Sequence, residues 1–153
     1  MQIDRIELRL LRLPLVRFFE TSFGRVHDKT FILVRLVGGG ADAWGECVAE
    51  DAPYYSSETN ETAWHVITGF LGPTLLRTVL SHPREVFPAF RAVRGHNMAK
   101  AALEMAAWGL YARQEGVALS KALGGHRTRI ASGVSVGIQD SLDELIERVG
   151  IEL

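Results

Sequence analysis

Cysteine is scarce in this chain: Cys47 is the only one among 153 residues. A single thiol excludes an internal disulfide and cannot by itself form a zinc site, and it suits a reducing cytoplasm, where we expect the protein. Long apolar runs are also absent, since none approaches the roughly 20 residues that a membrane-spanning helix requires. Met1–Leu13 carries charged side chains among its apolar positions, so we expect no signal peptide.

An excess of either charge is missing as well. Lys and Arg total 17 and Asp and Glu total 18, which gives a net charge of −1 and no sign of a nucleic-acid or anionic-membrane partner. Hydrophobic residues make up 47% and charged residues 23%, as in soluble globular proteins. This length holds one ordinary domain, or one small domain plus a fragment.

The first third of the chain predicts a small antiparallel meander. Alternation of apolar and charged residues from Ile6 to Leu10 indicates a half-buried strand, which Pro14 either ends or places at a sheet edge. Thr30–Val37 is rich in β-branched and aromatic residues and predicts a second strand. Three glycines turn the chain into a third strand over Ala43–Val48, and Phe18–Lys29 is expected to be a loop.

A block of helices follows. Ser57 is expected to cap the first helix, with Glu58 in its first turn. The strongest apolar stripe predicts a helix from about Met98 to Gln114, capped by Asn97. Gly109 lies inside that helix, where glycine costs about 1 kcal/mol relative to alanine.

The last segment predicts one strand, 129–138, and one helix, 142–149. One face of the strand is bulky and the other is nearly bare, with Ser135 between Gly133 and Gly137. Ser141 and Glu144 have the spacing of a capping box. Because a parallel strand with its crossover helix needs a next strand to pair with, we expect the front part of a larger protein, with domains at 1–127 and 128–153.

Six stretches, in order, resemble the enolase superfamily in its muconate-lactonizing branch, and most closely the o-succinylbenzoate synthases and N-acylamino acid racemases. They are Leu13–Leu15 with Glu20–Gly24, Trp44–Cys47, Pro53–Glu58, Gly95–Ala106, Leu123–Gly125 and Ser132–Ile138. Any one of them is weak, but the series covers nearly the whole chain in the family's order and spacing.

The resemblance implies an α+β fold: an enolase-like N-terminal capping domain, a three-stranded antiparallel meander plus helices, followed by the first strand-helix unit of a truncated (β/α) barrel. Such enzymes abstract a proton next to a carboxylate, with Mg²⁺ stabilising the anion and a barrel lysine as base. In o-succinylbenzoate synthase, a lyase of menaquinone biosynthesis, water is lost; in the racemase, an isomerase, the proton returns to the other face.

The resemblance also bears on single residues. The family's catalytic lysines and metal carboxylates follow later barrel strands, so we assign no catalytic residue and no metal ligand here, and we expect no Mg²⁺ to bind this chain. Asp140 and Glu144 belong to a helix cap and are not substitutes. Two cap loops, Phe18–Lys29 and Ala49–Tyr55, are expected to face the substrate. The predicted substrate-binding residues are Phe19, Phe23, Tyr55 and Ser135.

Three functions stay open at this point. The first is the N-terminal part of an o-succinylbenzoate synthase or N-acylamino acid racemase, inactive alone and binding its small carboxylate substrate only once a barrel is supplied. The second is an enzyme whose barrel comes from a separate chain. The third is a non-catalytic oligomerisation or binding module, because the apolar side of the last helix is expected to drive self-association through residues 129–149.

Overall fold

The computed structural model describes residues 1–22 and 24–153. The chain falls into two compact units, each with its own internal contacts. Unit 1 comprises Met1–Arg12 and Thr30–His126, and unit 2 comprises Leu13–Lys29 and Arg127–Leu153. The division into domains at residue 127 stays a prediction.

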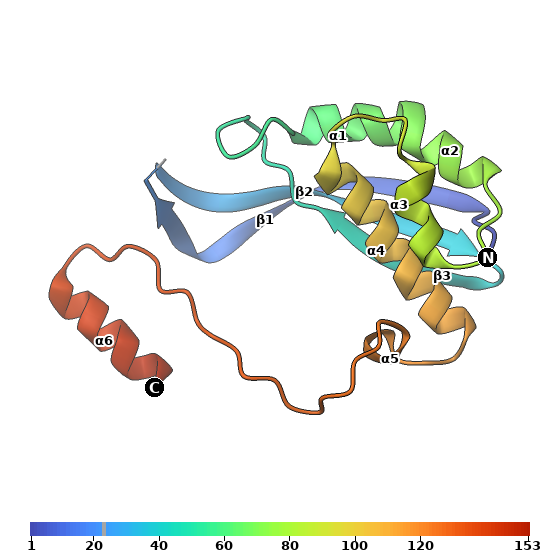
Figure 1. The fold of residues 1–153 in the computed structure, drawn as a ribbon. Coiled ribbons are helices and arrows are strands. Elements are labelled where there is room, and N and C mark those ends of the chain that lie inside the picture. The colour runs from blue at the N-terminus through green and yellow to red at the C-terminus, as the bar shows by residue number, and fades with distance from the viewer. Residues whose placement is uncertain (23) are drawn as a thin grey trace. The chain divides into compact units, whose positions relative to one another are not determined.

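The three-stranded meander is confirmed. Strands β1 (Arg5–Thr21), β2 (Gly24–Gly38) and β3 (Ala41–Cys47) form one sheet in the order β1-β2-β3 (Figure 1). β2 and β3 are antiparallel, with Ile32 opposite Cys47 and Gly38 opposite Ala41. Gly39 and Gly40 make the turn with φ of 57° and 79°, a backbone region that glycine enters without strain.

The predicted loop over Phe18–Lys29 is wrong. β1 continues to Thr21 and β2 begins at Gly24, so Phe18–Thr21 and Gly24–Lys29 belong to two paired strands. Pro14 lies within β1 and does not end it, because β1 is an edge strand and an edge tolerates the missing N–H of proline. Local polarity suggested a loop, whereas pairing between the two strands decides the structure.

The helices between residues 60 and 114 lie against one face of the sheet (Figure 1). The first run is continuous: α1 (Asn60–Val66), a π-helical turn (Ile67–Leu71) and α2 (Gly72–Arg77). A 3₁₀ turn (Pro83–Glu85), α3 (Val86–Ala89), α4 (Asn97–Gln114) and the short α5 (Leu119–Ala122) follow. Thr59, not Ser57, caps α1, in a capping box with Thr62.

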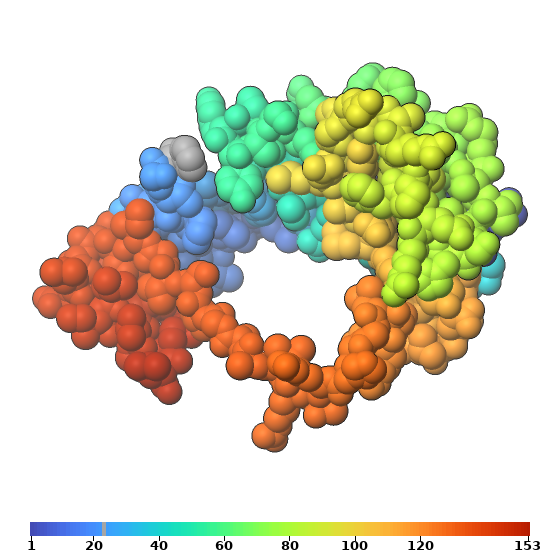
Figure 2. All heavy atoms as spheres, in the orientation of Figure 1, coloured from blue at the N-terminus to red at the C-terminus, as the bar shows by residue number. Residues whose placement is uncertain are grey.

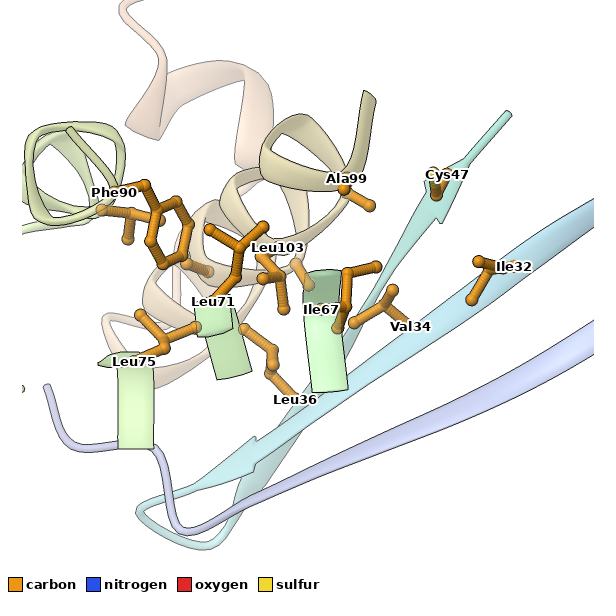
Figure 3. Packing of buried hydrophobic residues seen from close by; sticks show 14 of the residues in the cluster. Ile32, Val34, Leu36, Cys47, Ile67, Leu71, Leu75, Phe90, Ala99 and Leu103 are labelled. Atoms are coloured by element: carbon orange, nitrogen blue, oxygen red, sulfur yellow. The ribbon is translucent and has the colours of Figure 1, made fainter. Parts of the chain in front are cut away.

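Unit 1 has a continuous apolar core. Alternate residues of β2, Ile32, Val34 and Leu36, are fully buried, and in Figure 3 Val34 and Leu36 lie near helix residues Ile67 and Leu103. Burying one such side chain contributes about 1.5–3 kcal/mol, so this cluster dominates the stability of the unit.

Cys47 belongs to the same core and is a free, fully buried thiol. Burial raises its pKa; the backbone of Ala49 lowers the pKa in part, and the negative charge of Glu58 raises it further. The thiol therefore stays protonated at neutral pH.

Helix α4 packs closely along β3, and two glycines make this possible. A Cβ atom on Gly45 would lie 2.0 Å from the carbonyl oxygen of Ala102. A Cβ atom on Gly109 would lie 3.0 Å from the Cβ of Ala43. From the sequence alone, Gly109 only lowers the stability of the helix. In the structure it lies where α4 packs closely against β3.

The start of α4 is capped from a distance. His96, at φ 53°, precedes the helix, but its side chain makes no capping bond, and Asn97 is the first helical residue and not the predicted cap. The buried carboxylate of Glu58 instead accepts hydrogen bonds from the backbone N–H groups of Met98, at 3.0 Å, and Ala99, at 3.1 Å. Two of the family-like stretches, Pro53–Glu58 and Gly95–Ala106, therefore meet here.

In unit 2 the predicted strand over 129–138 is not formed. These residues carry no strand assignment, because a strand requires a paired neighbour and none is found for them among the residues that the structure describes. The helix after them is present as α6 (Leu142–Glu152), and the hydroxyl of Ser141 accepts a hydrogen bond from the N–H of Glu144.

In the described parts of the chain no helix is long and apolar enough to cross a membrane.

Candidate functional site

Unit 2 contains a cavity of about 640 Å³. One wall comes from the end of β1, Leu15–Glu20, and another from the segment Ser135–Asp140. Figure 2 shows the blue atoms of the hairpin adjoining the red atoms of the segment before α6. Two of the predicted substrate-binding residues, Phe19 and Ser135, thus line the same cavity, although they are far apart in sequence.

The ring of Phe19 lies near the nearly bare face of this segment. A Cβ atom on Gly137 would lie 3.8 Å from the ring, an ordinary van der Waals contact, so the space between the ring and the glycine has room for a methyl group. Ser135 precedes Gly137 by two residues, and its hydroxyl is both a donor and an acceptor in the lining. The cavity therefore combines apolar side chains such as Phe19 with polar and charged ones, and it can hold a ligand that has an apolar part and a polar part.

The acidic residues of this cavity already have partners. Glu20 and Asp140 both accept hydrogen bonds from Arg25, and Glu144 accepts the N–H of Asp140 at the start of α6. Mg²⁺ requires carboxylate oxygens that are available for coordination, so this set does not fit a magnesium site. Across the described residues, no three His, Cys, Asp or Glu side chains come together as a metal-binding group.

The other two predicted substrate-binding residues do not belong to the described lining of this cavity. Tyr55 belongs to unit 1, on the turn before α1, and 72% of the residue is exposed. Phe23 lies outside the residues that the structure describes. The substrate-binding role of all four residues stays a prediction.

A second hollow, of about 1000 Å³, lies in unit 1 between β3, α4 and α5. Its lining is largely apolar, including Trp44, Met105, Trp108 and Leu123. The charged residues of its lining are Glu46, Glu104 and Arg113. Phe19 and Ser135 line the cavity of unit 2 and not this hollow, so the cavity of unit 2 is the candidate site.

Arg25 is the residue of this site that the sequence did not indicate. Its guanidinium joins Glu20, five residues away, to Asp140, which is 115 residues away. A contact between residues so far apart produces no local pattern in the sequence. The only hint was that Arg25 follows the family-like stretch that ends at Gly24.

The sheet, the helices packed on it and the hairpin define an α+β capping domain of the enolase superfamily. Residues 5–124 match the family of the mandelate racemase / muconate lactonizing enzyme N-terminal domain, and the chain belongs to this family.

Curated relatives carry two names. The chain is 48% identical over 146 residues to the o-succinylbenzoate synthase of Geobacillus kaustophilus, an alignment covering 95% of this chain and 39% of that protein. It is 39% identical over 150 residues to the N-succinylamino acid racemase of an Amycolatopsis species, covering 98% of this chain and 41% of the racemase. The chain thus spans about 40% of the length of these relatives.

Solved structures show the same fold. An enolase-superfamily member from Listeria innocua superposes with a TM-score of 0.91 at 33% identity, over 99% of this chain and 41% of that one. An unknown member of the superfamily from Enterococcus faecalis V583 gives a TM-score of 0.87 at 40% identity, with the same coverage of both chains. The predicted fold class and superfamily are confirmed.

Proposed function

We propose that this chain is the substrate-covering N-terminal part of an enzyme of the o-succinylbenzoate synthase or N-succinylamino acid racemase type. The observation that carries the proposal is the shared cavity of Phe19 and Ser135, in which the ring of Phe19 lies close to Gly137. In this proposal the ring of Phe19 excludes water from the succinyl part of the ligand, and Ser135 donates a hydrogen bond to it.

The proton-transfer chemistry belongs, in this proposal, to the part of the relatives that the chain does not span. Magnesium would there stabilise the negative charge that forms next to the substrate carboxylate. The residues of this chain bind and orient the substrate and keep water out, and the 153-residue chain alone does not turn it over. The sequence features of the cap fit synthase and racemase equally well.

Fragment complementation tests this function. The chain would be mixed with the remaining part of the Geobacillus kaustophilus synthase, and dehydration would be followed with Mg²⁺ present. We expect turnover from the mixture, none from the chain alone, and a loss of about tenfold in substrate affinity on Phe19→Ala. Leu76→Ala, at an exposed position of unit 1, is the control and should leave the affinity unchanged. Turnover by the purified chain alone would overturn the proposal.

The third function, an oligomerisation module, is favoured by one specific observation. Along α6, Leu142, Ile146 and Val149 recur at helical spacing, and Ile146 is 69% exposed. We propose that this face pairs with its equivalent on a second copy of the chain, because an exposed amphipathic helix gains stability by burying its apolar stripe.

A charged side chain on the apolar face of α6 should abolish the pairing of two copies of the chain. Sedimentation analysis of the wild-type chain is expected to show a dimer or larger species, and Ile146→Glu a monomer, because a carboxylate at the interface would be desolvated without a partner. Glu147→Gln changes the charge of the neighbouring residue and should keep the wild-type assembly. A monomeric wild-type chain would refute self-association.

A further inference from the structure

One guanidinium in unit 2 holds three groups at once. Nε of Arg25 donates to Oε2 of Glu20 at 2.7 Å, and Nη2 donates to Oδ1 of Asp140. The same guanidinium lies over the ring of Phe18, with 4.4 Å between Cζ and the ring centre. Arg25 therefore ties the end of β1 to the residue that precedes the cap of α6.

We propose that Arg25 is a positioning residue, which clasps the hairpin end to residues 137–140 and thereby sets the wall of the substrate cavity. This inference rests on the proposed function. Arg25 is not among the residues that line the cavity, so it acts through its neighbours and not by contact with the ligand.

The placement of the three partners explains the effect on Phe19. Phe18 and Glu20 flank Phe19 on the two sides, and both are held by Arg25. Across the cavity, Asp140 follows Gly137 by three positions, and the ring of Phe19 lies close to Gly137. The clasp thus holds the two segments on which Phe19 and Gly137 lie.

Arginine is required for this geometry. A single exposed ion pair contributes little, and the side chains of Arg25 and Asp140 are 42% and 59% exposed. Here, however, two carboxylates and one ring all contact the planar guanidinium of Arg25, whose separate N–H groups point in fixed directions. A lysine ammonium can keep the charge but is a compact point donor, so it cannot reproduce the three contacts together.

Amide hydrogen exchange on the full 153-residue chain tests the clasp. Arg25→Gln, Asp140→Asn and the double variant would be compared with wild type at residues 18–22 and 135–140. Each single variant is expected to speed exchange at these residues by about fivefold. The double variant should speed exchange no more than a single variant does, because each of the three disrupts the same network around Arg25. Arg25→Lys should fall in between. Unchanged exchange at Ile32–Leu36 would show that the core of unit 1 is intact.

Arg148→Gln is the matched control, because Arg148 is an arginine of the same unit that lines the cavity but pairs with Glu152 on its own helix. It should leave exchange at residues 18–22 unchanged. The second measurement is the affinity for o-succinylbenzoate, which should fall severalfold in Arg25→Gln and recover in part in Arg25→Lys.

The two measurements separate the clasp from the function. Any of three results would overturn the clasp. The effects of the two single variants on exchange could be additive, residues 18–22 could lack protection in wild type, or Arg148→Gln could change exchange as much as Arg25→Gln does. If exchange responds as expected but the wild-type chain, alone and complemented, has no affinity for the succinyl ligand, the clasp stands and the proposed function fails. If the ligand binds and Arg25→Gln changes neither measurement, the proposed function stands and the clasp is wrong.

Discussion

Gly45→Ala is expected to destabilise the protein by about 3 kcal/mol or more, the upper end of what overpacking costs. The added Cβ would lie 2.0 Å from the carbonyl oxygen of Ala102 and 3.1 Å from the backbone nitrogen of Ala106. Both are backbone atoms of α4, which cannot yield as a flexible side chain would. Relief requires the whole helix to move away from β3, and this would open the contact that buries Ala99, Ala102 and Ala106.

Urea unfolding, followed by tryptophan fluorescence, measures this effect. Gly69→Ala is the matched control, because it lies in the helical run of unit 1 and its added Cβ would meet no atom within 4 Å. We expect that control to be neutral or stabilising by up to about 1 kcal/mol, since alanine favours a helix over glycine. A Gly45→Ala variant as stable as wild type would show that α4 does not approach β3 as closely as described.

The sequence predicted the meander and α4 because their patterns are local. The β-branched and aromatic composition of Thr30–Val37 and the apolar stripe of Met98–Gln114 depend on neighbours along the chain, and both predicted elements were confirmed. The role of Gly109 could not be predicted in this way. It depends on which strand the helix packs against, and no local pattern carries that information.

Errors arose where pairing between distant residues decides the outcome. Phe18–Lys29 has the composition of a loop, but Phe18–Thr21 and Gly24–Lys29 belong to strands that pair with each other. Residues 129–138 have the composition of a strand but no paired neighbour in the described chain. Of the candidate site, Phe19 and Ser135 could be named through the family resemblance, whereas Arg25 could not, because its partner lies 115 residues away.

Glu58 shows the same limit and leads to the second large effect. Its sequence neighbourhood suggested an acid in the first turn of the next helix, yet its carboxylate is buried and caps α4, 40 residues further on. Glu58→Ala would leave the N–H groups of Met98 and Ala99 without acceptors, and each buried donor without a partner costs about 1–3 kcal/mol. We therefore expect a loss of about 3 kcal/mol in the free energy of unfolding, measured by urea denaturation.

Two further variants identify the cause. Glu58→Gln keeps one oxygen acceptor but removes the charge that favours a helix N-terminus, so its loss should be smaller than that of Glu58→Ala. Glu61→Ala removes an exposed acid from the first turn of α1 and should cost only a few tenths of a kcal/mol. If Glu58→Ala and Glu61→Ala lower the free energy of unfolding by the same amount, the carboxylate of Glu58 acts only as a negative charge near a helix N-terminus. If the ranking holds, the two stretches around Glu58 and Met98 are joined by one buried side chain, which fixes where α4 begins.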